Sequence, residues 1–182
     1  MSAFPKPYGD RVAKLRVPFG FVLVITFAWL SQPSPRSMMI GLPVAALGLL
    51  LRGWAAGHLE KNIRLAQSGP YAYVRNPLYI GTLLVALGLV IAARRWPLAL
   101  IFAAVFLLVY LPVIELEEQH LRQLFPVFRA YSQRVPALLP TLQPLRTSEP
   151  FRWELYVRNR EYQALAGMVL GVMYLIGKMM FL

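Results

Sequence analysis

The sequence contains no cysteine and only two histidines among its 182 residues. The absence of cysteine excludes disulfide frameworks, thiolate metal sites and cysteine nucleophiles, and it leaves the redox compartment undetermined. The two histidines, His58 and His120, lack the H-E-x-x-H spacing of a zinc enzyme and are more typical of polar interface residues than of a base. The chain also has no Walker loop, no Gly-x-Gly-x-x-Gly turn and no Gly-x-Ser-x-Gly elbow. The common motifs of soluble enzymes are therefore missing.

Charge is also scarce, and acidic residues are the scarcest. Only 15% of the residues are charged, 58% are hydrophobic, and the mean hydropathy is +0.52. Soluble domains are about a quarter charged, so this composition argues against both a soluble domain and disorder. Nineteen Lys and Arg against eight Asp and Glu give a net charge of +11. In so apolar a chain we expect basic loops beside anionic lipid, with the lipid bilayer as a partner and neither nucleic acid nor metal.

Five apolar segments predict an all-α, multi-pass integral membrane protein. They cover residues 17–30, 38–57, 78–93, 96–114 and 162–182. A crossing helix needs about 20 residues, so the first segment is short and is expected to be tilted or partly interfacial. A cleaved signal peptide is the alternative, but residues 31–35 form no small-x-small cleavage site. Residues 94 and 95 alone separate the third and fourth segments, which predicts a tight antiparallel hairpin. We expect residues 1–182 to form a single domain.

The distribution of positive charge predicts the orientation. With the N-terminus in the cytoplasm, 14 Lys and Arg lie on the cytoplasmic side, three on the opposite side and two inside spans. This asymmetry follows the positive-inside rule, and the membrane is expected to be a bacterial inner membrane or the endoplasmic reticulum. Aromatic residues near the span ends are expected to anchor the interface: Trp54, Tyr71, Tyr79, Trp96 and Trp153. The cytoplasmic cations are Lys6, Arg11, Lys14, Arg16, Lys61, Arg64, Arg75, Arg122, Arg129, Arg134, Arg146, Arg152, Arg158 and Arg160.

Two cytoplasmic segments, residues 58–77 and 115–139, are the places where chemistry is expected, because the opposite loops are too short. The first contains turn signals at Ser68-Gly69-Pro70 and at Arg75-Asn76-Pro77, with three tyrosines around them. It is either a binding loop with aromatic walls or an interfacial loop with an aromatic belt.

The second segment has a helical pattern over residues 112–125, and its two adjacent carboxylates are predicted to differ. Glu118 precedes Arg122 by four residues, which is typical of an exposed pair. Glu117 aligns with Leu121, Leu124 and Phe128, so we expect it on the apolar face. A carboxylate there needs a partner. That partner is either an arginine (Arg64, Arg75 or Arg134) or the hydroxyl or ammonium group of a ligand.

Taken in order, these segments resemble a known family. The residues that carry the resemblance are Gly69-Pro70-Tyr71, Arg75-Asn76-Pro77-Leu78-Tyr79-Ile80-Gly81, Glu117-Glu118 with Leu121, Phe125, Tyr131, Arg134-Val135-Pro136 and Leu139-Pro140. The pattern is similar to that of the integral-membrane methyltransferases typified by isoprenylcysteine carboxyl methyltransferase and the related phospholipid N-methyltransferases. It covers a core of about residues 58–140.

The resemblance implies S-adenosyl-L-methionine as cofactor and a lipid-like methyl acceptor, with O-methylation of a carboxylate as the first expectation and phospholipid N-methylation as the alternative. It implies cofactor contacts at Ile63, Arg64, Leu65, Ala66, Tyr71, Asn76, Pro77, Leu78, Tyr79 and Glu117. Arg75 and Arg134 are candidates for orienting an anionic acceptor. The chain departs from the family in having Asn76 in place of histidine, Pro126 in place of glycine and no arginine at residues 112–114. Asparagine cannot carry charge, and the missing arginine weakens the case for a prenylcysteine carboxylate.

Two other functions stay open at this point. Membrane sterol reductases are distantly similar and use NADPH, although they are generally longer. A non-enzymatic membrane factor would bind neither cofactor.

Overall fold

The computed structural model describes residues 6–147 and 149–181, and within them every regular element is a helix. The side chains of Lys6, Arg11, Lys14 and Arg16, which contribute to the predicted orientation, lie outside the described residues. The elements are α1 (Lys6–Leu30), α2 (Pro35–Ala56), the 3₁₀ turn η1 (Gly69–Ala72), α3 (Pro77–Ala93), α4 (Trp96–Val105), the π-helical turn η2 (Phe106–Tyr110), α5 (Leu111–Leu124), α6 (Phe128–Arg134), α7 (Trp153–Arg158) and α8 (Tyr162–Phe181).

All five predicted apolar segments are helical. Among the described residues, three helices are long and apolar enough to cross a bilayer: Pro35–Ala56, Tyr162–Phe181, and Trp96–Leu124, which joins α4, η2 and α5. The apolar parts of α1 and α3, Pro18–Leu30 and Pro77–Ala93, are shorter. The 17 residues of α3 are at the lower limit for a crossing helix. The all-α, multi-pass membrane fold predicted from composition is confirmed.

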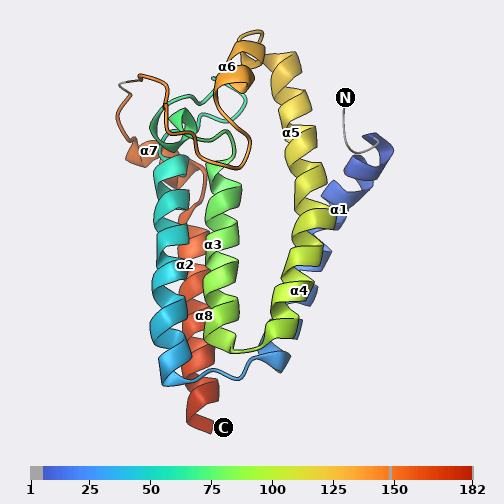
Figure 1. The fold of residues 1–182 in the computed structure, drawn as a ribbon, viewed down its shortest axis with the longest axis vertical. Coiled ribbons are helices and arrows are strands. Elements are labelled where there is room, and N and C mark those ends of the chain that lie inside the picture. Colours follow the sequence, from blue (N-terminus) through green and yellow to red (C-terminus); the bar gives the residue numbers. More distant parts are fainter. Residues whose placement is uncertain (1–5, 148, 182) are drawn as a thin grey trace.

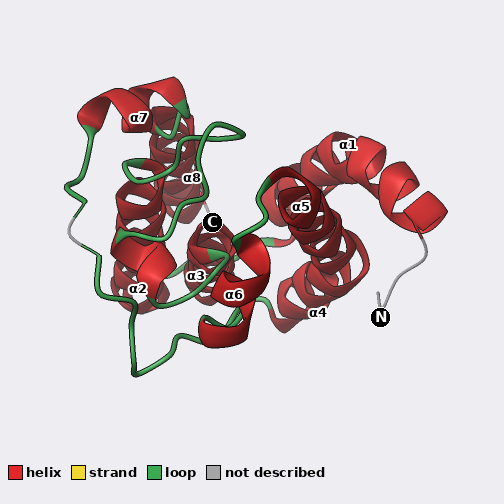
Figure 2. Ribbon diagram, turned by 90° about the horizontal axis from the view of Figure 1, so that it is seen from above, coloured by secondary structure: helices red, strands yellow, loops and turns green. Residues whose placement is uncertain are grey.

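The helices form two groups that share one end of loops (Figures 1 and 2). One group contains α2, α3 and α8, and the other contains α1, α4 and α5. The connection after α2 lies at one end of the molecule together with α6 and α7, and we call this end the cap (residues 57–76, 125–147 and 149–161). Among the described residues, the opposite end carries the short turns at residues 31–34 and 94–95 and the end of α8. The two segments expected to carry chemistry therefore lie at the same end of the molecule.

Glycine allows α2 and α3 to approach closely. Gly41 and Gly48 face Gly88 and Gly81, each pair seven residues apart on its own helix. A Cβ atom at Gly48 would lie 2.6 Å from the Gly81 carbonyl oxygen, and one at Gly88 would lie 2.5 Å from the Gly41 carbonyl oxygen. Small residues of this kind stabilise helix pairs in lipid, where apolar burial gives little drive for association. Gly81 and Gly88 therefore have a packing role between α2 and α3.

Local sequence signals define the turns at the opposite end. The Ser34 and Ser37 side chains form a capping box at the start of α2, with Pro35 in the first turn. The Ser37 hydroxyl also donates to the carbonyl of Ala92 on α3, at 2.8 Å. Arg94 ends α3 in the left-handed region, with φ 54°, and α4 begins at residue 96. The predicted tight hairpin is confirmed.

Polar groups hold α8 at both ends, although Leu175 is its only buried described residue. Lys178 donates to the carbonyl oxygens of Ala28 and Trp29 at 2.6 and 2.9 Å, at the end of α1. Glu161, immediately before α8, pairs with Arg52 of α2. Because apolar burial contributes little inside a bilayer, such contacts position the helix.

Candidate functional site

A buried ion pair joins the two cap segments. Arg75 donates from Nε and Nη2 to the two carboxylate oxygens of Glu118, both at 2.9 Å. Its Nη1 donates to the carbonyl oxygens of Ser132 and Val135 at 2.8 and 2.9 Å. The predicted pair of Glu118 with Arg122 is also present, with a longer separation of 4.0 Å. Four of the five N–H groups of Arg75 are thus engaged within the protein, so this residue is a structural cross-link.

Asn76 strengthens the same junction. Its Nδ2 donates to Glu118 at 3.1 Å and to the Ala137 carbonyl at 3.1 Å, which uses both amide hydrogens. The backbone N–H of Arg75 donates to the Pro136 carbonyl at 2.9 Å. The two segments expected to carry chemistry therefore contact each other, and only the side-chain carbonyl oxygen of Asn76 is left for other contacts.

The adjacent carboxylates Glu117 and Glu118 of α5 have the opposite environments from those predicted. Glu118 is buried and Glu117 is exposed. The predicted face extended to Phe128, but α5 ends at Leu124 and Phe128 belongs to α6. Leu121 lies four residues after Glu117 and three after Glu118, so its burial is compatible with either face. The prediction that Glu117 lies on the buried face is wrong.

Glu117 nevertheless lies close to the turn that carries Tyr71. Burial raises the pKa of Tyr71 well above its usual value, and the neighbouring Tyr131 phenol and the Glu117 and Glu161 carboxylates raise it further. Arg52 acts in the opposite direction. The exposed carboxylate of Glu117 is therefore within electrostatic reach of a buried, neutral phenol. Tyr71 is 7% exposed, so its expected role as an interface anchor is wrong.

Tyr131 secures the Tyr71 turn from the later part of the chain. Its hydroxyl donates to the Tyr71 backbone carbonyl at 2.8 Å, and both residues are buried. Burial also raises the pKa of Tyr131 above its usual value, with Arg75 opposing and Glu118 adding to the rise. Both phenols therefore stay protonated at neutral pH.

A second ion pair beneath the turn was not predicted. Arg52 donates to Glu161 from Nε at 2.5 Å and from Nη2 at 3.0 Å. Its Nη1 donates to Thr82 at 2.5 Å and to the Leu78 carbonyl at 3.3 Å. The group links α2, α3 and the start of α8. In the sequence, a single arginine in an apolar segment indicates that a polar partner exists. The partner of Arg52 is 109 residues further along the chain, so the sequence does not identify it.

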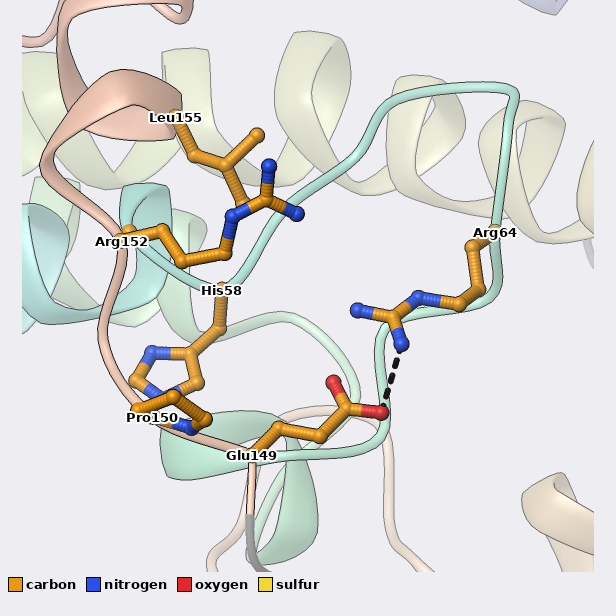
Figure 3. Close-up of a pocket in the computed structure, with 7 residues that line it drawn as sticks. His58, Arg64, Glu149, Pro150, Arg152 and Leu155 are labelled. Carbon is orange, nitrogen blue, oxygen red and sulfur yellow. Dashed lines mark hydrogen bonds and ion pairs between the residues drawn. The ribbon is translucent and has the colours of Figure 1, made fainter.

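A cavity of about 200 Å³ lies between the loop after α2 and the segment before α7 (Figure 3). Its wall carries Arg64 and Glu149, paired at 2.6 Å, and Arg152, which is paired with Glu60. Ligand pockets are usually about 300–1,000 Å³, so this cavity has room for part of a nucleoside-sized ligand only.

His58 forms the buried side of this cavity and connects it to η1. Its Nδ1 contacts the Trp54 carbonyl at 3.0 Å, and because a carbonyl only accepts, Nδ1 carries the proton. Gly69 has φ +57°, and a Cβ atom there would lie 2.7 Å from the His58 ring. Glycine at the first position of the Gly69-Pro70-Tyr71 motif is thus required by both its backbone angle and the adjacent ring. His58 is 6% exposed and is a packed wall residue rather than an interface residue.

The remaining predicted site residues are distributed around the cap. Ile63 and Arg64 are exposed, whereas Leu65 and Ala66 are half-buried in the same loop. Pro77 is buried at the start of α3, and Leu78 and Tyr79 are half-buried. The Tyr79 ring meets Tyr110 of the π-helical turn edge-on, with centroids 6.1 Å apart. Arg134, at the end of α6, is exposed.

Comparisons with known proteins indicate the family of this chain. The family model described as phospholipid methyltransferase matches residues 16–127. The cobalt-zinc-cadmium resistance protein CzcN of Cupriavidus metallidurans is 34% identical over 133 residues, 72% of this chain and 59% of that protein. The nickel-cobalt-cadmium resistance protein NccN of Alcaligenes xylosoxydans xylosoxydans is 33% identical over 125 residues, 68% of this chain and 57% of that protein.

The chain thus matches less than two thirds of the length of these curated relatives. No solved structure matches it. The family model covers more than half of the chain, including the Tyr71 turn, Arg75, Asn76, Glu117 and Glu118. The chain therefore belongs to the phospholipid methyltransferase family, a family of membrane methyltransferases.

Proposed function

We propose that this protein transfers a methyl group from S-adenosyl-L-methionine to a lipid-like acceptor at the cap. The observation that carries the proposal is the contrast between the adjacent carboxylates Glu117 and Glu118 of α5. Glu118 holds the Arg75–Asn76 turn in place, while Glu117 is exposed and acts electrostatically on Tyr71, whose pKa it raises. Glu118 thus joins the two cap segments that carry the family resemblance, and Glu117 is available to bind a ligand.

The exposed residues suit part of the cofactor. The Glu117 carboxylate is an acceptor for ribose hydroxyls or an ammonium group, and the half-exposed Arg64 is a donor for a carboxylate. Asn76 does not suit the role implied by the resemblance, because both of its amide hydrogens are already donated. When bound, the cofactor supplies a sulfonium methyl group that is already electrophilic.

The protein's part in this reaction is mainly positioning. Two reactants held in line gain a large rate advantage without an added base when the acceptor is a carboxylate or a neutral amine. Burial raises the pKa of Tyr71 and keeps its phenol neutral, so the turn that carries it adds no charge near the Glu117 carboxylate. Arg134 is exposed and is the candidate for orienting an anionic acceptor, whereas the donors of Arg75 are engaged elsewhere.

The acceptor group has two candidates. O-methylation of a lipid-like carboxylate, as in the isoprenylcysteine enzymes, is the first. The family model, described as phospholipid methyltransferase, and the absence of arginine at residues 112–114 favour a phospholipid amine as the second. The positive charge gathered at the cap supports a cytoplasmic location for this end of the molecule.

The decisive experiment supplies labelled methyl donor and a lipid extract to the purified chain in lipid. We expect labelled lipid from the wild type and much less from Glu117→Gln. Alkaline hydrolysis of the product distinguishes the acceptors, since a methyl ester releases volatile methanol and an N-methyl group does not. A thermal shift with NADPH but not with S-adenosylmethionine would support a reductase instead, and no shift with either would support a non-enzymatic factor.

The names of the two relatives suggest a test in cells. If this chain contributes to metal resistance as their names indicate, cells lacking it should be more sensitive to cobalt and cadmium. The wild-type gene should restore growth, and Glu117→Gln should not. Restoration by Glu117→Gln would separate resistance from methyl transfer.

A further inference from the structure

We propose that residues 136–146, here called the leucine loop, insert into an anionic phospholipid surface beside the cap. Two of its leucines are strongly exposed. Leu139 is 78% exposed and Leu142 is 98% exposed, the highest exposure of any large apolar side chain among the described residues. The proposal does not depend on the methyltransferase function.

The leucine loop is held firmly, so its exposed leucines are not explained by a loose backbone. The Arg75 N–H donates to the Pro136 carbonyl at 2.9 Å, and the Thr141 N–H donates to the Tyr73 carbonyl at 2.9 Å. The Leu145 N–H donates to the Ala72 carbonyl at 3.2 Å. Both ends and the middle are therefore attached to the end of η1 and the residues that follow it, and the fixed backbone presents the two leucines outward.

This attachment places the leucine loop at the membrane boundary. Its partners lie in residues 72–76, which directly precede Pro77, the first residue of the apolar helix α3. Where an apolar helix begins, hydrocarbon gives way to the headgroup region. Apolar side chains held outward at that level are expected to enter lipid.

The charge around the leucine loop indicates which lipid it meets. Between Glu118 and Glu149 the sequence has no acidic residue. The same stretch contains four arginines, all exposed: Arg122, Arg129, Arg134 and Arg146. Arg134 and Arg146 flank the two leucines. Basic residues beside inserted apolar ones favour anionic headgroups.

The chain's lack of cysteine allows a direct test of insertion. A single-cysteine variant, Leu142→Cys, is labelled with an environment-sensitive fluorophore in lipid nanodiscs. Gln133→Cys on α6 is the matched control, since Gln133 is also exposed and α6 lies at the outer end of the cap (Figure 1). We expect brominated phospholipid to quench the label at residue 142 several-fold more than the label at residue 133, and neutral acrylamide to quench it less.

Two results would overturn the proposal. Equal acrylamide quenching at the two positions would mean that the leucine loop lies in water. Protection from acrylamide without quenching by brominated lipid would mean that a protein, such as a second copy of the chain, covers it.

Lipid charge is tested with brominated phosphatidylglycerol against brominated phosphatidylcholine at equal content. We expect stronger quenching at residue 142 by the anionic lipid, and we expect Arg146→Glu to reduce that preference. Arg36→Glu, an exposed arginine at the opposite end, should leave it unchanged. Equal quenching by the two lipids in the wild type would refute the anionic preference. Circular dichroism and gel filtration identify variants that do not fold.

Discussion

The adjacent carboxylates of α5 allow one structural claim to be tested with two nearly identical substitutions. Glu118→Gln removes the charge that faces Arg75 in a pair whose side chains are 12% and 13% exposed. The guanidinium then stays buried without a counter-charge, while two backbone carbonyls still hold it in place. Glu117→Gln makes the same chemical change one residue away, at an exposed position.

The two free-energy costs should differ widely. Removing one partner of a buried ion pair typically costs about 3–5 kcal/mol, because the other charge is left uncompensated. An exposed substitution usually changes stability by less than about 0.5 kcal/mol. We therefore expect Glu118→Gln to lower the free energy of unfolding by roughly 3 kcal/mol more than Glu117→Gln. Replacing Arg75 and Glu118 together with methionine should recover much of the loss.

Equilibrium unfolding in mixed micelles of mild detergent and dodecyl sulfate, followed by circular dichroism, measures these differences. Binding of S-adenosylmethionine is measured on the same samples. Glu117→Gln should weaken binding while leaving the fold stable, and Glu118→Gln should destabilise the fold first. Equal losses of stability for the two variants would contradict the buried pair. Normal cofactor binding by Glu117→Gln would contradict the proposed contact between Glu117 and the cofactor.

Three further predictions concern packing, pH and the anchoring of α8. Gly48→Ala should destabilise the protein by about 1–3 kcal/mol, because its Cβ would meet α3 backbone at 2.6 Å, whereas Gly167→Ala, with open space around it, should be neutral or stabilising in the same unfolding assay. Above the unfolded tyrosine pKa of about 10, the unfolded chain loses a proton that buried Tyr71 keeps, so stability should fall by up to about 1.4 kcal/mol per pH unit for this residue and less steeply in Tyr71→Phe. Below about pH 10 the stability that neutral Tyr71 contributes is fully present. An equal fall of stability with alkaline pH in the wild type and in Tyr71→Phe would contradict the raised pKa of Tyr71. Lys178→Met should cost about 1.5–3 kcal/mol, since it removes charged hydrogen bonds to α1, and no change would mean that these hydrogen bonds do not hold this end of α8.

The fold was largely predictable because membrane solvation restricts the possibilities. Uncharged runs of this length can only be helices in lipid, and a two-residue connection between two of them can only be a hairpin. The gathering of positive charge at one end also agrees with the placement of both chemistry-bearing segments in the cap. These inferences depend on composition and order, which a single sequence contains in full.

The side-chain partners were predictable only in part. Helical spacing identified two carboxylates but could not decide which one is buried, because the end of α5 at Leu124 depends on the turn that follows it. Arg75 was correctly named as a possible partner of a carboxylate, although of the wrong one. The contact of Arg52 with Glu161 joins residues 109 positions apart, and no local pattern indicates such a distance.

The later part of the chain explains why the motif turn has a definite shape. The family match ends at residue 127, yet the carbonyls that receive Arg75 belong to Ser132 and Val135. Ala137 receives Asn76, and Tyr131 donates to the turn at Tyr71. Without these partners, the buried donors of Arg75 and Asn76 would be unsatisfied, at a cost of about 1–3 kcal/mol for each group. Residues 128–137 are therefore part of how the site is built, and differences among relatives in this stretch should alter the site as much as differences within the motif itself.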